Sequence, residues 1–261
     1  MWTHVKKLTH YWDLLSTMVF RDIQVRYKQT ILGVAWAIAQ PLAYMVILTV
    51  LKSAIFKEPN SEGAPHQVFL YCATVPWMFF QNSLGQATNS VSGNLNLVKK
   101  IYFPREIFPL AAILASVVDF LIASLIFAGM MVYYHVPVTV SLLWVPGLFA
   151  VEFLFVTGVG MFVAASNVFY RDIKYIVPLV VQLLFFASPV FYSVSDVPPR
   201  LLRWYLLNPM AVVIDGFRQA IMHGSAPAMG PLAVSLTVSV VCCVAAYAYF
   251  KRVEFKFADL I

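Results

Sequence analysis

The chain has 261 residues, of which 61% are hydrophobic and 11% are charged, and its formal net charge is +6. Soluble globular domains carry roughly 25% charged residues, so this composition excludes an ordinary soluble domain. It is typical of an integral membrane protein, because an ionisable side chain at the centre of a spanning helix costs about 2.5–3.5 kcal/mol. We therefore predict an all-α integral membrane protein with a single transmembrane domain over residues 1–261.

Residues 1–28 are predicted to form an amphipathic helix at the cytoplasmic interface. Apolar residues recur there at steps of three and four, as on one face of a helix: Leu8, Tyr11, Trp12, Leu15, Val19 and Ile23. His10, Asp13 and Arg21 fall mainly on the opposite side. The apolar run is too short and too interrupted for a span, so we place it along the membrane surface.

Six windows are predicted to cross the membrane, since a spanning helix needs roughly 20 mainly apolar residues. They are 29–51, the uncharged stretch 63–98 with its most apolar part at 68–84, then 107–134, 142–168, 175–194 and 231–250. Only Asp119 and Glu152 place a charge inside them. Five spans thus fall in residues 29–192 and the sixth in 231–250, followed by a cytoplasmic tail at 251–261.

The segment 193–230 is long for an external loop and contains two apolar pieces, Leu201–Leu207 and Met210–Met222. Asn208 before Pro209 is a favourable cap and first-turn pair for the second piece. We expect two short helices that form a re-entrant pair in the outer leaflet before the last span.

The distribution of lysine and arginine predicts the orientation. With the amino terminus inside, the inner segments hold thirteen of the eighteen basic residues, and five remain outside. Both termini are therefore expected in the cytoplasm. The positive net charge is explained by topology, so no nucleic acid partner is expected.

Several motifs occur at fixed places relative to these helices. The first runs from Arg21 to Gly33 and leads into Trp36-Ala37 and Gln40-Pro41. The others, in chain order, are Pro76-Trp77 with Phe79-Phe80 and Asn82, Lys99-Lys100 through Phe103-Pro104 and Phe108-Pro109, Asn167 to Ile173, Ser188-Pro189-Val190 with Tyr192, and Leu207-Asn208-Pro209. The ordered set, over residues 8–255, resembles permeases of the ABC-2 transporter family, in the branch that exports O-antigen, capsule or teichoic acid.

This resemblance implies a homodimeric permease of the bacterial inner membrane that works with two copies of an ABC ATPase subunit. The interface helix and the first inner loop would contact the ATPase. Lipid-linked polysaccharide would pass between the two permease copies, mainly along their first and fifth spans, and membrane lipids would be further partners. No glycine here is followed by lysine, so the G-x-x-x-x-G-K-[ST] phosphate loop is missing. We expect ATP and Mg on the partner subunit, no cofactor on this chain, and no enzymatic activity of its own.

Aromatic side chains of the first and fifth spans are the candidates for the glycan pathway, because sugar rings have apolar faces that stack on aromatic rings. They are Trp36, Tyr44, Phe185, Phe186, Phe191 and Tyr192. The alternative for each is contact with lipid, a packing neighbour or the interface belt. Successive residues on a helix point about 100° apart, so at most one of Phe185 and Phe186 faces the pathway fully.

Two sets of basic residues each have two interpretations. Before the first span stand Arg21, Arg26 and Lys28. They anchor the chain on lipid phosphates, bind the pyrophosphate of the lipid carrier through the planar arginine donors, or do both. In the first inner loop stand Lys99, Lys100 and Arg105. These are either anchors alone or also contacts that couple the chain to the ATPase.

Four further charged residues need a role. Asp119 and Glu152 lie at membrane depth, where burial is expensive, so they are either structural groups or sites of proton coupling. Asp215 and Arg218 stand three apart on a predicted outer helix. They either pair with each other or line an exit gate.

Three rival functions stay open. The nearest is an ABC-2 permease for a small amphipathic drug or lipid. A proton-coupled secondary carrier would instead use Asp119 and Glu152. A membrane enzyme is disfavoured, because the five histidines are scattered and suggest no nucleophile or metal set. Among polysaccharides, the motifs do not separate O-antigen, capsule and teichoic acid.

Overall fold

The structure, a computed structural model, describes residues 11–28, 33, 35–55, 66–94, 97 and 103–258. The helices are α2 (Trp12–Tyr27), α3 (Ala35–Ile55), α4 (His66–Ser90), α6 (Ile107–Tyr133), α7 (Trp144–Phe169), α8 (Ile173–Phe186), α9 (Pro199–Tyr205), α10 (Pro209–Ile221) and α11 (Met229–Val253). Short 3-10 turns are η1 (Ser92–Asn94), η2 (Val140–Leu143), η3 (Val194–Asp196) and η4 (Glu254–Ala258). No β-strand occurs in these described ranges, and the all-α class is confirmed.

Within the described residues, three helical segments are long and apolar enough to cross a membrane, namely Ile107–Tyr133, Val140–Phe169 and Met229–Phe257. Ala35–Leu51 and Ile173–Phe186 are shorter apolar helices. The 25 residues of α4 reach about 37 Å at 1.5 Å per residue, but many amide and hydroxyl side chains lower the hydropathy of its second half. The predicted count of six spans therefore remains a prediction.

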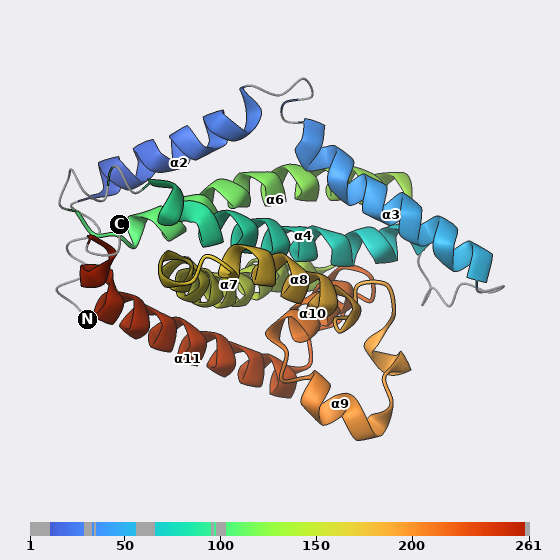
Figure 1. Ribbon diagram of the computed structural model, residues 1–261. Helices are drawn as coiled ribbons and strands as arrows, with labels where there is room; N and C mark the ends of the chain where they lie inside the picture. Colours follow the sequence, from blue (N-terminus) through green and yellow to red (C-terminus); the bar gives the residue numbers. More distant parts are fainter. Residues whose placement is uncertain are drawn as a thin grey trace.

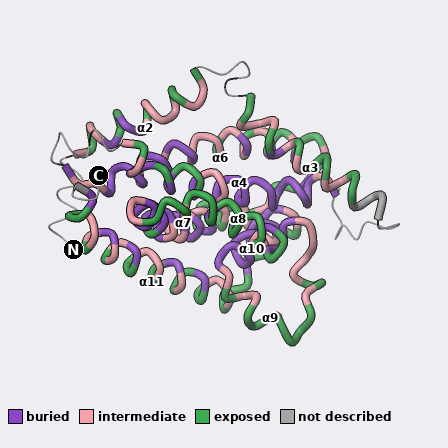
Figure 2. The backbone as a smooth tube through the Cα atoms, in the orientation of Figure 1, coloured by how far each residue is buried: buried purple, intermediate pink, exposed green. Residues whose placement is uncertain are grey.

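Helix α4 lies at the centre of the bundle, because it packs against α3, α6, α7, α8 and α10. Figure 1 shows α2 beside α6 on one side of the molecule and α11 beside α7 on the other. In Figure 2, α4 and α10 are mostly buried, whereas α8, α9 and α11 carry many exposed residues. The helices with exposed apolar residues thus form the perimeter around a buried α4.

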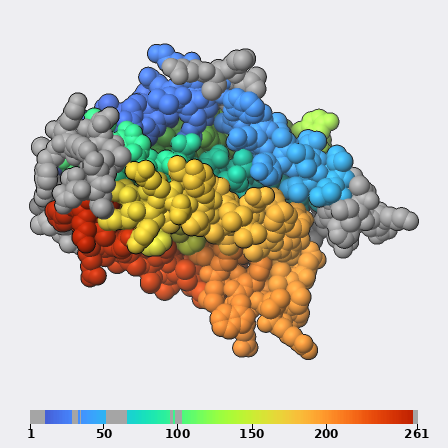
Figure 3. All heavy atoms as spheres, in the orientation of Figure 1, coloured from blue at the N-terminus to red at the C-terminus, as the bar shows by residue number. Residues whose placement is uncertain are grey.

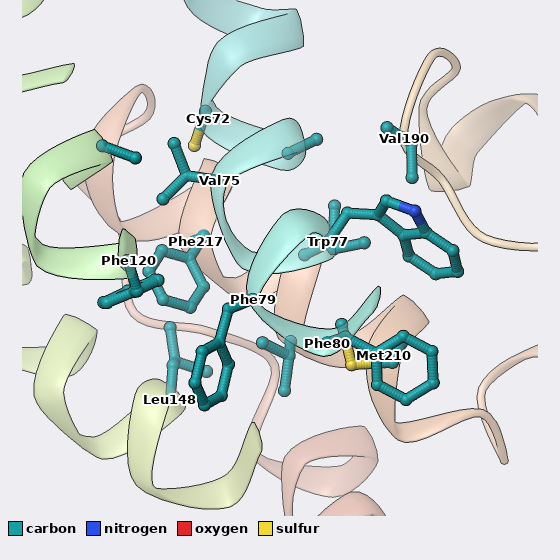
Figure 4. Close-up of a cluster of buried hydrophobic side chains, with 14 of the residues drawn as sticks. Cys72, Val75, Trp77, Phe79, Phe80, Phe120, Leu148, Val190, Met210 and Phe217 are labelled. Carbon is teal, nitrogen blue, oxygen red and sulfur yellow. The ribbon is translucent and has the colours of Figure 1, made fainter. Parts of the chain in front are cut away.

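Aromatic rings join α4, α6 and α7 in the core. Figure 4 shows Phe79 of α4, Phe120 of α6 and Leu148 of α7 in one buried cluster. Phe79 of α4 lies 5.7 Å from Phe120 and 5.2 Å from Phe149 between ring centroids, and Phe120 stacks on Phe149 at 4.3 Å. Such pairs contribute about 0.5–1.5 kcal/mol beyond their burial. This cluster fixes the distance between α4 and its two neighbours.

Helices α7 and α11 approach closely at Gly158. A Cβ atom on this residue would lie 2.8 Å from the backbone of Cys243, so only glycine permits the contact. Small residues serve this purpose in membrane helix pairs, where van der Waals packing drives association.

Cys72, Cys242 and Cys243 are free thiols.

Most predicted helix limits agree with the structure, and two do not. The window predicted at 29–51 contains Gly33, a turn residue with a φ of 50°, and its helix α3 begins at Ala35. The span predicted at 175–194 is helical only as far as Phe186, because Pro189 disfavours helical geometry at the residue before it. The predicted cap is confirmed: the Asn208 side chain accepts a hydrogen bond from Met210 N at 3.1 Å, with Pro209 in the first turn.

Segment 193–230 contains the two expected helices, α9 and α10. Helix α10 is almost wholly buried against α4, α7 and α11, whereas α9 is largely exposed. That the pair dips into the outer leaflet remains a prediction.

Helix α2 covers the second half of the predicted interface segment. It buries Leu15 and Met18 against the bundle and exposes Trp12, Phe20 and Val25. Exposed apolar side chains on both flanks suit a helix that also touches lipid or a partner protein. Its position at the membrane surface remains a prediction.

Candidate functional site

Two cavities adjoin on α4. The first, called here the α6 cavity, measures about 250 Å³ and is lined by residues of α2, α3, α4 and α6. The second, the α8 cavity, measures about 540 Å³ and is lined by residues of α3, α4 and α8. Asn82 and Gln86 of α4 line both. In Figure 3 the teal surface of α4 is visible between blue α3 and yellow α8.

The structure places four of the six predicted pathway aromatics on these cavities. Trp36 lines the α6 cavity, and Tyr44, Phe185 and Phe186 line the α8 cavity. Phe185 is 9% exposed and Phe186 is 60% exposed, so the two rings face different surroundings. This difference agrees with the 100° angle between successive residues of a helix.

The other two aromatics extend the same row from α8 towards α9. Phe186 lies 6.0 Å from Phe191, Phe191 lies 5.0 Å from Tyr192, and Tyr192 lies 6.4 Å from Tyr205 of α9. The Tyr205 hydroxyl donates a hydrogen bond to the Tyr192 hydroxyl at 3.0 Å. Burial raises the pKa of the Tyr205 phenol, and the hydrogen bond that it donates to Tyr192 raises this pKa further, so Tyr205 keeps its proton. A continuous aromatic row therefore connects α8 with α9.

The basic residues of α2 differ in their partners. Arg21 donates to Asp22 at 2.8 Å and to Asn94 at 2.9 Å. Arg26 donates to Asp119 in the middle of α6 and, at 3.4 Å, to the Ser116 hydroxyl. Lys28 is exposed. Of the three, Arg26 is the residue that reaches into a cavity, and it does so as half of an ion pair.

The two acidic residues at membrane depth have different surroundings. Asp119 accepts hydrogen bonds from both Arg26 and Tyr27, which tie the end of α2 to α6. Glu152 of α7 is fully buried, and neither carboxylate oxygen is hydrogen-bonded to another described residue. The contacts of Asp119 favour a structural role, and the structural and proton-coupling roles of both residues stay predictions.

A charged cluster joins the start of α6 to the end of α11. Lys251 donates to Glu106 at 2.7 Å and to Glu254 at 3.1 Å. Arg105 donates to the Glu254 carbonyl oxygen, and its guanidinium lies 5.9 Å from the Phe257 ring. Arg105 is thus held by the η4 turn. Lys99 and Lys100, also predicted to couple to the ATPase, lie outside the described residues.

Arg218 of α10, predicted to lie in the outer loop, is 3% exposed. Its guanidinium donates to the carbonyl oxygens of Tyr192 and Val190, both at 2.8 Å, and lies 3.5 Å over the Phe69 ring. It therefore fixes the segment after α8 from within the protein. Asp215 accepts from Gln219 at 2.6 Å. The gate suggested for Asp215 and Arg218 remains a prediction.

Sequence reasoning gave no role to the amides that line the cavities: Gln40, Gln81, Asn82, Gln86 and Gln182. Gln40 and Asn82 stood within the family motifs, and the density of amides and hydroxyls in the second half of α4 was a usable signal. Among the residues that the structure describes, no group of three or more His, Cys, Asp and Glu is arranged to hold a metal ion.

Comparison with known proteins identifies the family. A sequence model described as the ABC-2 type transporter matches residues 13–222. The chain is 27% identical to an O-antigen export system permease protein of Klebsiella pneumoniae, over 97% of each chain. It is 26% identical to one of Myxococcus xanthus, over 98% of each, and 20% identical to a polysialic acid transport protein of Escherichia coli, over 80% of this chain and 81% of that protein. Since the match covers most of the sequence, the chain belongs to the ABC-2 type transporter family.

Proposed function

We propose that this chain is the permease half of an ATP-driven exporter that moves lipid-linked polysaccharide across the bacterial inner membrane. One observation carries the proposal: the aromatic row from Tyr44 through Phe185 to Tyr192 lies beside two polar-lined cavities on α4. Aromatic faces support sugar rings without strong directional bonds. The O-antigen export permeases among its relatives favour a polysaccharide cargo for this chain.

The proposed topology has six spans with both termini in the cytoplasm. Helices α3 and α8 would supply the two spans that are short in the structure, and α4 would cross with its polar face turned inward. One apolar cluster supports the assignment of both termini to the same, cytoplasmic side. It contains Leu15 of α2, Phe103 of the loop before α6, and Phe250 and Phe257 near the carboxyl end. Segments expected in the cytoplasm from opposite ends of the sequence therefore meet at one end of the bundle.

A second copy of the chain would complete the pathway. Helices α3 and α8 expose large apolar side chains beside the α8 cavity, including Ile47, Leu179 and Leu183. A homodimer that joins these faces would cover them and enclose a channel between the two cavities. A channel suits a long polymer, which no single pocket encloses.

The energy would come from two copies of a separate ABC ATPase subunit, which would hold ATP and Mg, and no cofactor is proposed on this chain. Helix α2 and the loop before α6 would receive the movement of the ATPase. The Arg26–Asp119 pair would transmit it from α2 to α6, and Arg105 would tie the loop to η4. Arg21, Arg26 and Lys28 remain the proposed contacts of the carrier pyrophosphate. Arg26 would reach it only by exchanging Asp119 for the phosphate.

The test is co-purification of the chain with the ATPase encoded beside it, followed by reconstitution and measurement of ATP hydrolysis. Cells that lack the permease should accumulate the lipid-linked glycan inside, and the gene should restore its export. Normal surface glycan in the deletion strain, with ATPase activity stimulated by a small amphipathic compound, would support the rival permease function. Transport by the purified chain without any ATPase would support the proton-coupled carrier.

A further inference from the structure

Five amide side chains from three separate helices converge on the two cavities. Gln40 comes from α3, Gln81, Asn82 and Gln86 come from α4, and Gln182 comes from α8. An amide placed in an apolar medium without a hydrogen-bond partner costs several kcal/mol. Their convergence on open space therefore indicates that water or a polar ligand occupies that space.

Most of these amides keep their hydrogen-bonding capacity for a ligand. Gln81 accepts a hydrogen bond from Trp77 Nε1 at 3.2 Å. No hydrogen bond joins the side chain of Gln40, Asn82, Gln86 or Gln182 to another residue within the described ranges. Each amide offers two donors and an acceptor with two lone pairs. Such a set matches hydroxyl groups, which both donate and accept.

The cavities are also electrically balanced. All eleven residues that line the α8 cavity are uncharged. The α6 cavity has two charged residues in its lining, Arg26 and Asp119, and these pair with each other. A carboxylate in the α8 cavity would meet no cation, and in the α6 cavity it would first have to displace Asp119 from Arg26. Any hydration that it loses there is therefore not compensated, at a cost of several kcal/mol per charge. A second copy of the chain would add cavities with the same net-neutral lining.

We propose that the α4 amide track, defined as Gln40, Gln81, Asn82, Gln86 and Gln182, binds the hydroxyl groups of a neutral glycan and excludes glycans that carry a carboxylate in each repeat. The inference rests on the proposed export function and names the class of its cargo. The amides contact the sugar hydroxyls, and the aromatic row supports the apolar ring faces. Residues on α4 thereby become part of a pathway that the sequence assigned mainly to α3 and α8.

The first experiment compares Asn82→Leu and Gln86→Leu with Asn89→Leu in cells that lack the native permease. Asn89 is an exposed amide of the same helix that lines neither cavity, and its side chain donates to the Gly85 carbonyl oxygen at 3.5 Å. Surface glycan is measured per amount of assembled complex, so a variant that fails to fold is recognised. We expect about a tenfold loss for each track variant, since one or two lost hydrogen bonds correspond to that factor. The control should match the wild type, and Gln86→Asn should retain at least half of its export.

The second experiment compares two hosts whose glycans share the undecaprenyl diphosphate carrier. One glycan is neutral, and the other has a carboxylate in every repeat. Export of the neutral polymer alone supports the proposal, and equal export of both overturns the exclusion of charge. Export by the track variants at the level of Asn89→Leu overturns the role of the amides. If the wild-type chain exports no glycan in either host, the proposed function itself is wrong.

Discussion

The pair between Arg26 and Asp119 should be the main polar tie between α2 and the transmembrane bundle. The Asp119→Asn change removes the negative charge that compensates Arg26. The side chains of Arg26 and Asp119 are 20% and 14% exposed. Removing one member of a buried ion pair costs about 3–5 kcal/mol. Both groups retain some exposure, so we expect about 2–4 kcal/mol here.

The assay is a double-mutant cycle on the thermal unfolding of the purified permease–ATPase complex. Arg26→Leu with Asp119→Leu removes both charges, and this double variant should be more stable than either single one. The matched control is Asp22→Asn, because Asp22 pairs with an Arg21 side chain that is 37% exposed. An exposed pair is worth at most about 1 kcal/mol.

Additive effects of the two changes would refute the proposed tie. A different result would arise if Asp119→Asn left stability unchanged but abolished transport. Asp119 would then be a functional group, either in transmitting the ATPase movement or in proton coupling. Transport by the purified chain without an ATPase would distinguish the two.

Three further changes test the packing and the polar contacts. Gly158→Ala should destabilise the protein by about 1–3 kcal/mol, because the new Cβ would lie 2.8 Å from the α11 backbone. Gly129→Ala, where a Cβ meets nothing within 4 Å, is the control in the same denaturation series. Lys251→Leu removes the ammonium group that lies 2.7 Å from the Glu106 carboxylate, and Glu106 is only 1% exposed. We expect the free energy of unfolding to fall by about 3 kcal/mol or more. The double variant with Glu106→Leu should recover most of this loss. Asn208→Ala removes the cap of α10 and should lower the stability by about 1–2 kcal/mol. The measurement is the rate of proteolysis in segment 193–230, which should increase. An unchanged rate would mean that tertiary packing alone holds α10 in place.

Local features of the sequence determined where most helices lie. The apolar window at 107–134 became α6, and the Asn208-Pro209 pair begins α10 as predicted. Both signals act over a few residues, because helix periodicity and capping depend on neighbours in the chain. Where a helix-breaking residue was not taken into account, as with Pro189 after α8, the predicted helix was too long.

The family could also be identified from sequence alone, since its motifs keep a fixed order along the chain. The structure brings three of the aromatic candidates, Tyr44, Phe185 and Phe186, to one cavity, and their role in the pathway stays a prediction. Their orientation was not predictable, because a helix that is apolar on every side gives no sign of which face meets a partner.

The partners of the polar residues were decided only by the tertiary structure. Arg26 and Asp119 are separated by 93 residues in the sequence. The hydrogen-bond acceptors of Arg218 are carbonyl oxygens of the segment after α8, which its own helix does not reveal. The amides of α4 meet those of α3 and α8 only because α4 lies at the centre of the bundle. Sequence alone thus determined the class, the family and the local helices of this protein, through rules that act within a few residues or along the order of the chain. The cavities and their balance of charge required the packing of distant helices, which no local pattern specifies.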